Sequence, residues 1–220
     1  MVAKLETTEK MPSSGEVKKI VIFLHGYGAD GADLISLSDP LSGQIPNCFF
    51  SAPNAPRKCG ASPFGFEWFP IPEVDGSSVP VMMKALAESE KLVNSLIEDY
   101  LQKFSLRFED VVLVGFSQGT MISLNIGLRH SNILAGIVGF SGKVLMPDIL
   151  KSEKKAEYPP VLLVHGDADE VVPISFLHEA DNILKDLEVN FSTHVSQNVG
   201  HGIAPDGLEK AVVFMKKVLL

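Results

Sequence analysis

The segment Gly115-Phe116-Ser117-Gln118-Gly119 places a serine between two glycines, and its surroundings indicate what that serine could do. The apolar, mostly β-branched run 111–114 before it predicts a buried strand, and residues 120–130 after it predict a helix. A strand that turns directly into a helix strains the turn residue, and flanking glycines relieve the crowding because they lack a Cβ. The hydroxyl would stand at a helix N-terminus, whose partial positive charge favours an oxyanion. The sequence therefore predicts a nucleophilic Ser117; the alternative is an ordinary glycine-rich turn.

A serine hydroxyl is a poor nucleophile at neutral pH and needs a neighbouring general base. Of the six histidines, His201 fits best, because it lies after the last expected strand and before the last expected helix. That position puts it at the same edge of the sheet as Ser117. The other five have plainer interpretations as packed, solvated or turn-stabilising residues: His25, His130, His165, His178 and His194.

The acid that orients the base should follow an intervening strand, and two aspartates do so. Asp167 and Asp169 come directly after the apolar run 161–164. Spacing does not separate them, and either could instead cap the next helix or accept from loop N–H groups. The chain order serine, aspartate, histidine is the order found in α/β-hydrolases.

Strand and helix patterns alternate from residue 19 to the end of the chain. This alternation predicts one α/β domain, with a mostly parallel central sheet, helices on both faces and ligands bound at the carboxyl ends of the strands. Residues 1–16 are expected to be weakly ordered or to form an edge strand over 5–11 that makes a hairpin with the next strand. Strands are expected at 19–24, 47–52, 110–114, 134–140, 161–164 and 189–195, and helices at 33–41, 81–104, 120–130, 147–155, 174–187 and 206–219.

Composition excludes several other classes of protein. A formal charge of −8 over 220 residues argues against nucleic acid or an anionic membrane surface as the main partner. We expect no integral membrane association and no signal peptide, and the two cysteines, Cys48 and Cys59, form no disulfide framework, so a cytoplasmic location is expected. No metal or other cofactor is expected, because the histidines and cysteines lack ligand spacing and the glycines at 26, 28 and 31 miss the dinucleotide-binding pattern.

Four motifs in one order make the resemblance to a known family specific. They are residues 23–28 (FLHGYG), 115–119 (GFSQG), 165–173 (HGDADEVVP) and 200–202 (GHG). From about residue 19 to 219 the chain resembles the phospholipase/carboxylesterase family of α/β-hydrolases, which includes acyl-protein thioesterases. The resemblance implies that Asp169 is the acid and that the backbone N–H groups of Tyr27 and Gln118 form the oxyanion hole. The sequence departs from the family pattern at Pro70 and Thr120.

These features together predict a serine carboxylesterase that hydrolyses ester or thioester bonds of short- to medium-chain acyl substrates through an acyl-enzyme. The substrate is expected to be a small ester or thioester, an acylated protein or a lysophospholipid, and the protein a monomer or homodimer without a lid domain. The alternative is a non-catalytic protein of the same fold that binds a hydrophobic ligand. Six residues are expected to line the acyl site: Phe64, Phe66, Trp68, Phe69, Val171 and Val172. The alternative for the four aromatic residues is that they form a satellite core.

Overall fold

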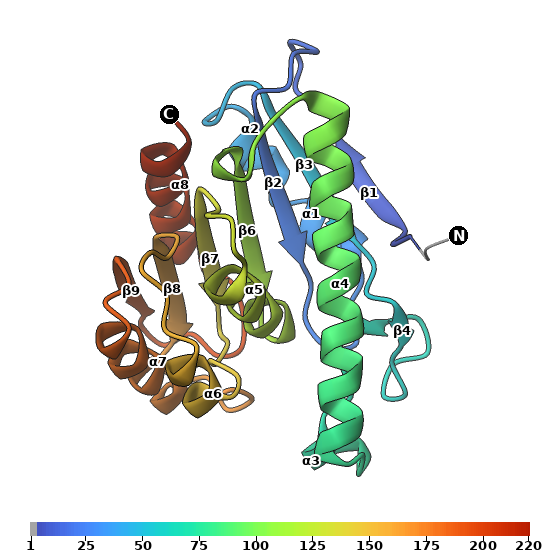
Figure 1. Cartoon of the computed structure of the whole chain (residues 1–220), viewed down its shortest axis with the longest axis vertical. Coiled ribbons are helices and arrows are strands. Elements are labelled where there is room, and N and C mark those ends of the chain that lie inside the picture. Colours follow the sequence, from blue (N-terminus) through green and yellow to red (C-terminus); the bar gives the residue numbers. More distant parts are fainter. Residues whose placement is uncertain (1–3) are drawn as a thin grey trace.

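A seven-stranded sheet forms the centre of the computed structural model, which describes residues 4–220 (Figure 1). Its strand order is β1-β3-β2-β6-β7-β8-β9, and every neighbouring pair except β1 and β3 is parallel. The parallel strands therefore end at one common edge. The strands are β1 (Thr7–Lys10), β2 (Lys19–Leu24), β3 (Cys48–Pro53), β6 (Val111–Phe116), β7 (Gly136–Phe140), β8 (Val161–Gly166) and β9 (Phe191–Ser196).

Helices cover both faces of this sheet, because the central strands carry apolar side chains on both sides. On one face, alternate residues of β2 and β6 pack against α4 (Val79–Phe104) and α5 (Gln118–Arg129), and β7 and β8 pack against α5, α6 (Pro147–Ser152) and α7 (Ser175–Asp186). On the other face, the intervening residues pack against α1 (Gly31–Ile35), α2 (Ser38–Ser42) and α8 (Pro205–Leu219). Figure 1 shows α4 and α5 in front of the sheet and α1 and α2 behind it. The α/β architecture expected from the alternating pattern is confirmed.

The first strand pairs differently from the expected hairpin. β1 lies antiparallel to β3, with Thr7 opposite Pro53 and Lys10 opposite Phe50. A hairpin with β2 is impossible because β3 and β6 already occupy both sides of that strand. The expectation of an edge strand here was right about the strand and wrong about its partner.

The single helix expected over residues 33–41 is two short helices, α1 and α2. Pro40 explains the break. Its ring would clash with the carbonyl of Ser36 in a continuous helix, and it has no N–H to donate to that carbonyl.

The connections after β3 and β7 at the carboxyl edge contain little regular structure. Residues 54–78 form only a two-stranded hairpin, β4 (Arg57–Lys58) with β5 (Phe66–Glu67), and the one-turn helix α3 (Pro72–Asp75). Between β7 and β8 the chain forms only α6, so no lid domain is inserted there.

Candidate active site

Ser117 is the turn residue between β6 and α5, and its backbone is strained. Its φ of 54° and ψ of −115° lie outside the regions that residues with a Cβ normally adopt. Such a conformation costs about 1–3 kcal/mol and persists only where the surroundings enforce it. The Ser117 N–H donates to the carbonyl of Phe140 at 2.8 Å, which ties the turn to the neighbouring strand.

The two glycines of the motif are required by close backbone approach. A Cβ on Gly119 would lie 1.7 Å from the carbonyl oxygen of Leu24, and one on Gly115 would lie 2.4 Å from the carbonyl carbon of Gly119. Neither position could hold a larger residue without moving backbone. Helix α5 therefore begins in direct contact with the end of β2, and Ser117 is fixed at the carboxyl edge.

Two side chains in the first turn of α5 hold it further, and the sequence pattern did not reveal them. The Thr120 hydroxyl donates toward the carbonyls of Gly115 at 2.8 Å and Phe140 at 2.7 Å. The buried Gln118 amide accepts from the Trp68 N–H at 2.8 Å and donates to the Phe69 carbonyl at 2.7 Å. Gln118 had been given a role only for its backbone N–H, and Thr120 had been noted only as a departure from the family pattern. The only feature of the sequence that could have indicated this role was the polar residue Gln118 directly after the serine.

His201 and Asp169 meet at the same edge, as the loops after β9 and β8 bring them together. His201 Nδ1 lies 2.8 Å from Asp169 Oδ2. The other carboxylate oxygen accepts from the N–H groups of Val171 at 2.9 Å and Val172 at 2.8 Å. With Nδ1–H directed to the carboxylate, neutral His201 carries its free lone pair on Nε2.

The Asp169 carboxylate is buried, so its ionisation depends on these partners. Burial opposes the charged form, but the hydrogen bonds from His201 and the Val172 N–H together lower the pKa of Asp169 below its ordinary value. The side chain is therefore a charged acceptor for His201 at neutral pH.

Geometry separates the two aspartates that spacing left equivalent. Asp167 is exposed, and its Oδ1 accepts from the Asn198 N–H at 2.6 Å, so it fastens two loops together. Asp169 alone of the two contacts His201.

The loop after β2 borders Ser117. An added Cβ on Gly26 would lie 3.4 Å from the Ser117 Cβ. The Gly28 N–H donates to the Phe66 carbonyl at 2.9 Å, and the Phe66 N–H donates to Ala29 at 2.8 Å, so β5 holds this loop in place. Tyr27 lies within this fixed loop. The N–H of Gln118, the first residue of α5, has no acceptor within the helix.

The His201 ring packs against Phe116, the residue before the serine, with 4.8 Å between ring centroids. His201 thus stands beside the strand-to-helix turn. Ser117, His201, Asp169 and the Tyr27 loop converge at the carboxyl edge.

The residues expected to line an acyl site fall into two groups. Trp68 is fully buried and Phe69 is 2% exposed, and both belong to the core beneath α4. These two side chains therefore pack in the same core cluster as β2, β6 and α4. Val172 is also buried, whereas Phe64 and Val171 are exposed at 83% and 68%, and Phe66 is partly buried under the Lys58 ammonium.

His25 and His165 are structural, as expected. The buried ring of His25 bridges the Gly26 carbonyl at 2.7 Å and the Ala55 N–H at 3.0 Å, and burial lowers its pKa. His165 Nε2 lies 2.7 Å from the Val172 carbonyl and 3.5 Å from Asp169 Oδ2, so it packs behind the carboxylate.

Within residues 4–220 no three His, Cys, Asp or Glu side chains are placed to hold a metal ion.

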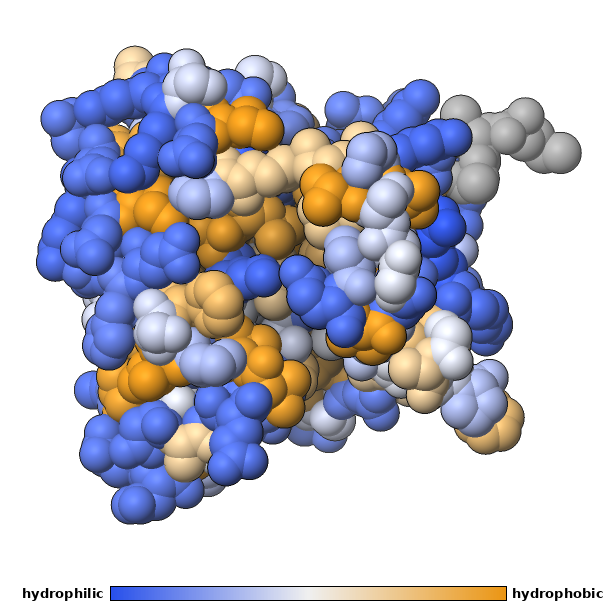
Figure 2. Space-filling view, turned by 90° about the horizontal axis from the view of Figure 1, so that it is seen from below, coloured by the Kyte–Doolittle hydropathy of each residue, from blue (hydrophilic) through white to orange (hydrophobic). Residues whose placement is uncertain are grey.

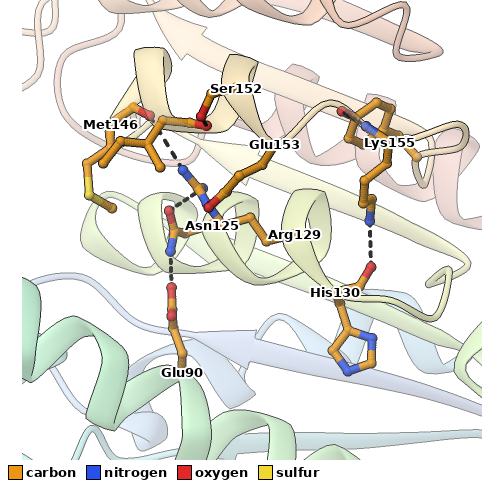
Figure 3. Close-up of polar contacts among 10 residues, drawn as sticks. Glu90, Asn125, Arg129, His130, Met146, Ser152, Glu153 and Lys155 are labelled. Carbon is orange, nitrogen blue, oxygen red and sulfur yellow. Dashed lines mark hydrogen bonds and ion pairs between the residues drawn. The ribbon is translucent and has the colours of Figure 1, made fainter.

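A chain of polar contacts fastens α5 to its neighbouring helices (Figure 3). Glu90 of α4 accepts from the Asn125 amide, which in turn accepts from the Arg129 guanidinium. Arg129 Nε also donates to Glu153, after α6, at 2.9 Å. Burial raises the pKa of Glu90 to about 7, Arg129 opposes this rise and Glu153 adds to it. The helix that starts at Ser117 is therefore anchored through a carboxyl group that titrates near neutrality.

Glu90→Gln should change how stability depends on pH. The folded protein favours protonated Glu90, so wild-type stability is lost as pH rises from about 4.5 through 7, whereas a glutamine keeps the acceptor and carries no charge. The variant's free energy of unfolding relative to wild type should rise between pH 5 and pH 8, by on the order of 1–2 kcal/mol. Urea denaturation at both pH values measures this. Glu88→Gln, on the same helix but exposed, is the matched control, and parallel profiles for Glu90→Gln and wild type would contradict the prediction.

Fold and site together define an α/β-hydrolase, and comparison with known proteins agrees. The chain belongs to the phospholipase/carboxylesterase family, whose model matches residues 6–219. It is a member of a hydrolase family, and its resemblance to that family in the sequence is confirmed.

Individual relatives are similar over nearly the whole chain. Acyl-protein thioesterase 1 of Saccharomyces cerevisiae is 31% identical over 215 residues, which cover 92% of this chain and 93% of the relative. The crystal structure of esterase PE8 superposes with a TM-score of 0.91 at 40% identity, covering 99% of this chain and all of that one (100%). Acyl-protein thioesterase 2 of Zea mays superposes with a TM-score of 0.78 at 23% identity, over 98% and 99% of the two chains, and shows the shared fold.

Proposed function

We propose that this protein is a serine carboxylesterase acting on ester or thioester bonds through an acyl-enzyme. The observation that carries the proposal is the strained Ser117, held at the start of α5, at the same edge as a histidine bonded to a buried carboxylate. Similarity to an esterase and to acyl-protein thioesterases supports the same reaction class.

In this proposal, Ser117 Oγ attacks the carbonyl carbon and His201 Nε2 takes the hydroxyl proton. Asp169 holds the imidazole in the required tautomer and stabilises the imidazolium that forms. The N–H groups of Tyr27 and Gln118 stabilise the oxyanion, the second aided by the N-terminus of α5. Collapse of the tetrahedral intermediate expels the alcohol or thiol, which leaves with the proton from His201. Water then attacks the acyl-serine by the same route and releases the acid.

Labelling with a fluorophosphonate probe tests the assignment of the nucleophile. Such probes react with activated serines, so the wild-type protein should become labelled and peptide mapping should place the adduct on Ser117. Ser117→Ala should not be labelled. A protein that binds hydrophobic ligands without catalysis would stay unmodified, and labelling at another serine would refute the assignment.

The carboxyl edge points to substrates that arrive in solution or on a larger molecule. In the part of the chain that the structure describes, no inserted lid domain covers this edge. Figure 2, which views the molecule from below Figure 1, shows apolar side chains gathered toward the middle of this face. No helix within residues 4–220 has the length and apolarity needed to cross a membrane.

Initial rate should therefore follow smooth saturation as the concentration of a longer-chain ester passes the point where micelles form. An enzyme whose lid opens at an interface shows a sharp rise there. The measurement is rate against ester concentration, with a short-chain ester that forms no micelles as the control. A jump confined to the longer ester would show that part of this edge closes over the site.

A further inference from the structure

A depression lies beside the proposed catalytic residues, on the face of the sheet covered by α1 and α8. It has a volume of about 390 Å³, at the lower end of the range usual for small-ligand pockets, ~300–1,000 Å³. Its walls come from four separate parts of the chain. They include Gly26, Asp33, Leu37, Phe116, His201 and Ile203.

The position of this depression relative to Ser117 decides what part of a substrate could enter it. Gly26 lies against both Phe116 and Ser117, since an added Cβ would be 3.2 Å from the Phe116 ring and 3.4 Å from the Ser117 Cβ. His201 also lines the depression, whereas the core aromatic residues beneath α4 do not. The group that departs from a tetrahedral intermediate must lie next to the histidine that protonates it.

The chemistry of the walls indicates what kind of group fits. Leu37, Phe116 and Ile203 are partly buried apolar side chains that pack on the core and leave one side open. Among the lining residues, only Asp33 and His201 are titratable. Asp33 is exposed at the rim on α1, and Asp30 lies one turn before it. The rim is therefore anionic, and none of the described residues that line the depression is basic apart from His201.

We propose that this depression is the subsite for the leaving alcohol or thiol, and that it selects compact apolar groups that are neutral or cationic over anionic ones. The inference rests on the proposed esterase function. It assigns specificity for the leaving group to α1 and the His201 loop, separate from whatever residues receive the acyl chain.

The first test keeps the acyl group fixed as butanoyl and lengthens a simple alkyl alcohol from ethanol to pentanol, because these alcohols differ little in acidity. For the wild-type protein, kcat/KM should rise about two- to fourfold for each CH₂ that becomes buried. Leu37→Trp fills the depression and should remove this rise, while the dependence on acyl chain length of ethyl esters stays as in wild type. Ile203→Ala removes bulk from another lining residue and should move the optimum to a longer alcohol.

The second test examines charge with butanoyl esters of a quaternary-ammonium alcohol, its neutral tert-butyl isostere and a carboxylate-bearing alcohol of similar length. The wild-type order should be cationic or neutral above anionic. Asp33→Asn keeps the oxygen that accepts from the Asp30 N–H and should reduce the cation-to-anion ratio of kcat/KM about two- to fivefold.

The outcomes separate the inference from the function on which it rests. A flat response to alcohol length in a wild-type protein that is labelled at Ser117 would overturn the leaving-group subsite and leave the esterase proposal intact. Equal loss for every ester in a folded Leu37→Trp variant would also overturn it, since a merely structural role has that effect. A wild-type protein that turns over no ester and takes up no probe would overturn both.

Discussion

Ser117→Ala should lower kcat/KM for any ester substrate by about 10⁴-fold or more, with folding retained. Alanine removes only the attacking oxygen, and the glycines and Thr120 that enforce the turn are unchanged. What activity remains would come from the oxyanion donors and substrate binding alone.

Steady-state hydrolysis of a chromogenic ester, together with circular dichroism and a thermal melt, measures this. Ser123→Ala is the matched control, because it also deletes a buried hydroxyl from α5, one whose partner is the Gly119 carbonyl at 2.7 Å. It should keep activity within about an order of magnitude. A folded Ser117→Ala protein with more than a few per cent of wild-type activity would mean that another residue is the nucleophile.

Asp169→Asn should lower kcat by a comparable factor, about 10⁴. An asparagine can present an N–H where His201 Nδ1–H needs an acceptor, which would favour the wrong imidazole tautomer, and it removes the charge that stabilises the imidazolium. The Val171 and Val172 N–H groups hold the side-chain oxygen in place, so the loop should keep its shape.

Asp167→Asn provides a matched comparison two residues away. Its amide oxygen can still accept from the Asn198 N–H, and it is Asp169, not Asp167, that contacts His201. We expect a change in kcat of less than about tenfold for this variant. If Asp167→Asn were the inactive variant and Asp169→Asn the active one, the assignment of the acid would be wrong.

The fold could be predicted from the sequence because its parallel strands are buried on both faces. Runs such as 19–24 and 111–114 are apolar throughout most of their length, and each is separated from the next by a helix-length segment. The pairing of β1 could not be predicted, since its four residues are all polar and carry no apolar alternation that would specify a partner strand. The break at Pro40 was visible in the sequence, and the proline outweighs the apolar spacing around it.

The candidate site was predictable in its chain order and not in its details. Both aspartates after β8 lie at the correct edge, and spacing did not separate them. The family resemblance pointed to Asp169, and the structure adds its contacts with His201 and with the Val171 and Val172 N–H groups. Aromatic content alone could not distinguish a pocket wall from the core. The Gln118 amide accepts from the Trp68 N–H and the Ser89 hydroxyl of α4 donates to the Trp68 carbonyl, so both side chains hold this segment beneath α4. The catalytic roles themselves stay predictions that the variants above test.

The strained backbone of Ser117 has a consequence for how this sequence could vary. At a φ of 54° and ψ of −115°, glycine is the residue with the lowest conformational energy, so stability by itself would favour replacing the serine. The neighbouring Gly115 and Gly119 show the opposite relation, because enlarging Gly115 would disrupt the packing of β6 on the start of α5, and enlarging Gly119 the packing of α5 on β2. Within five residues the chain thus combines two positions where stability and reactivity favour the same side chain and one where they conflict. A stability-guided redesign of this protein that ignored chemistry would preserve the turn and discard its reactive hydroxyl.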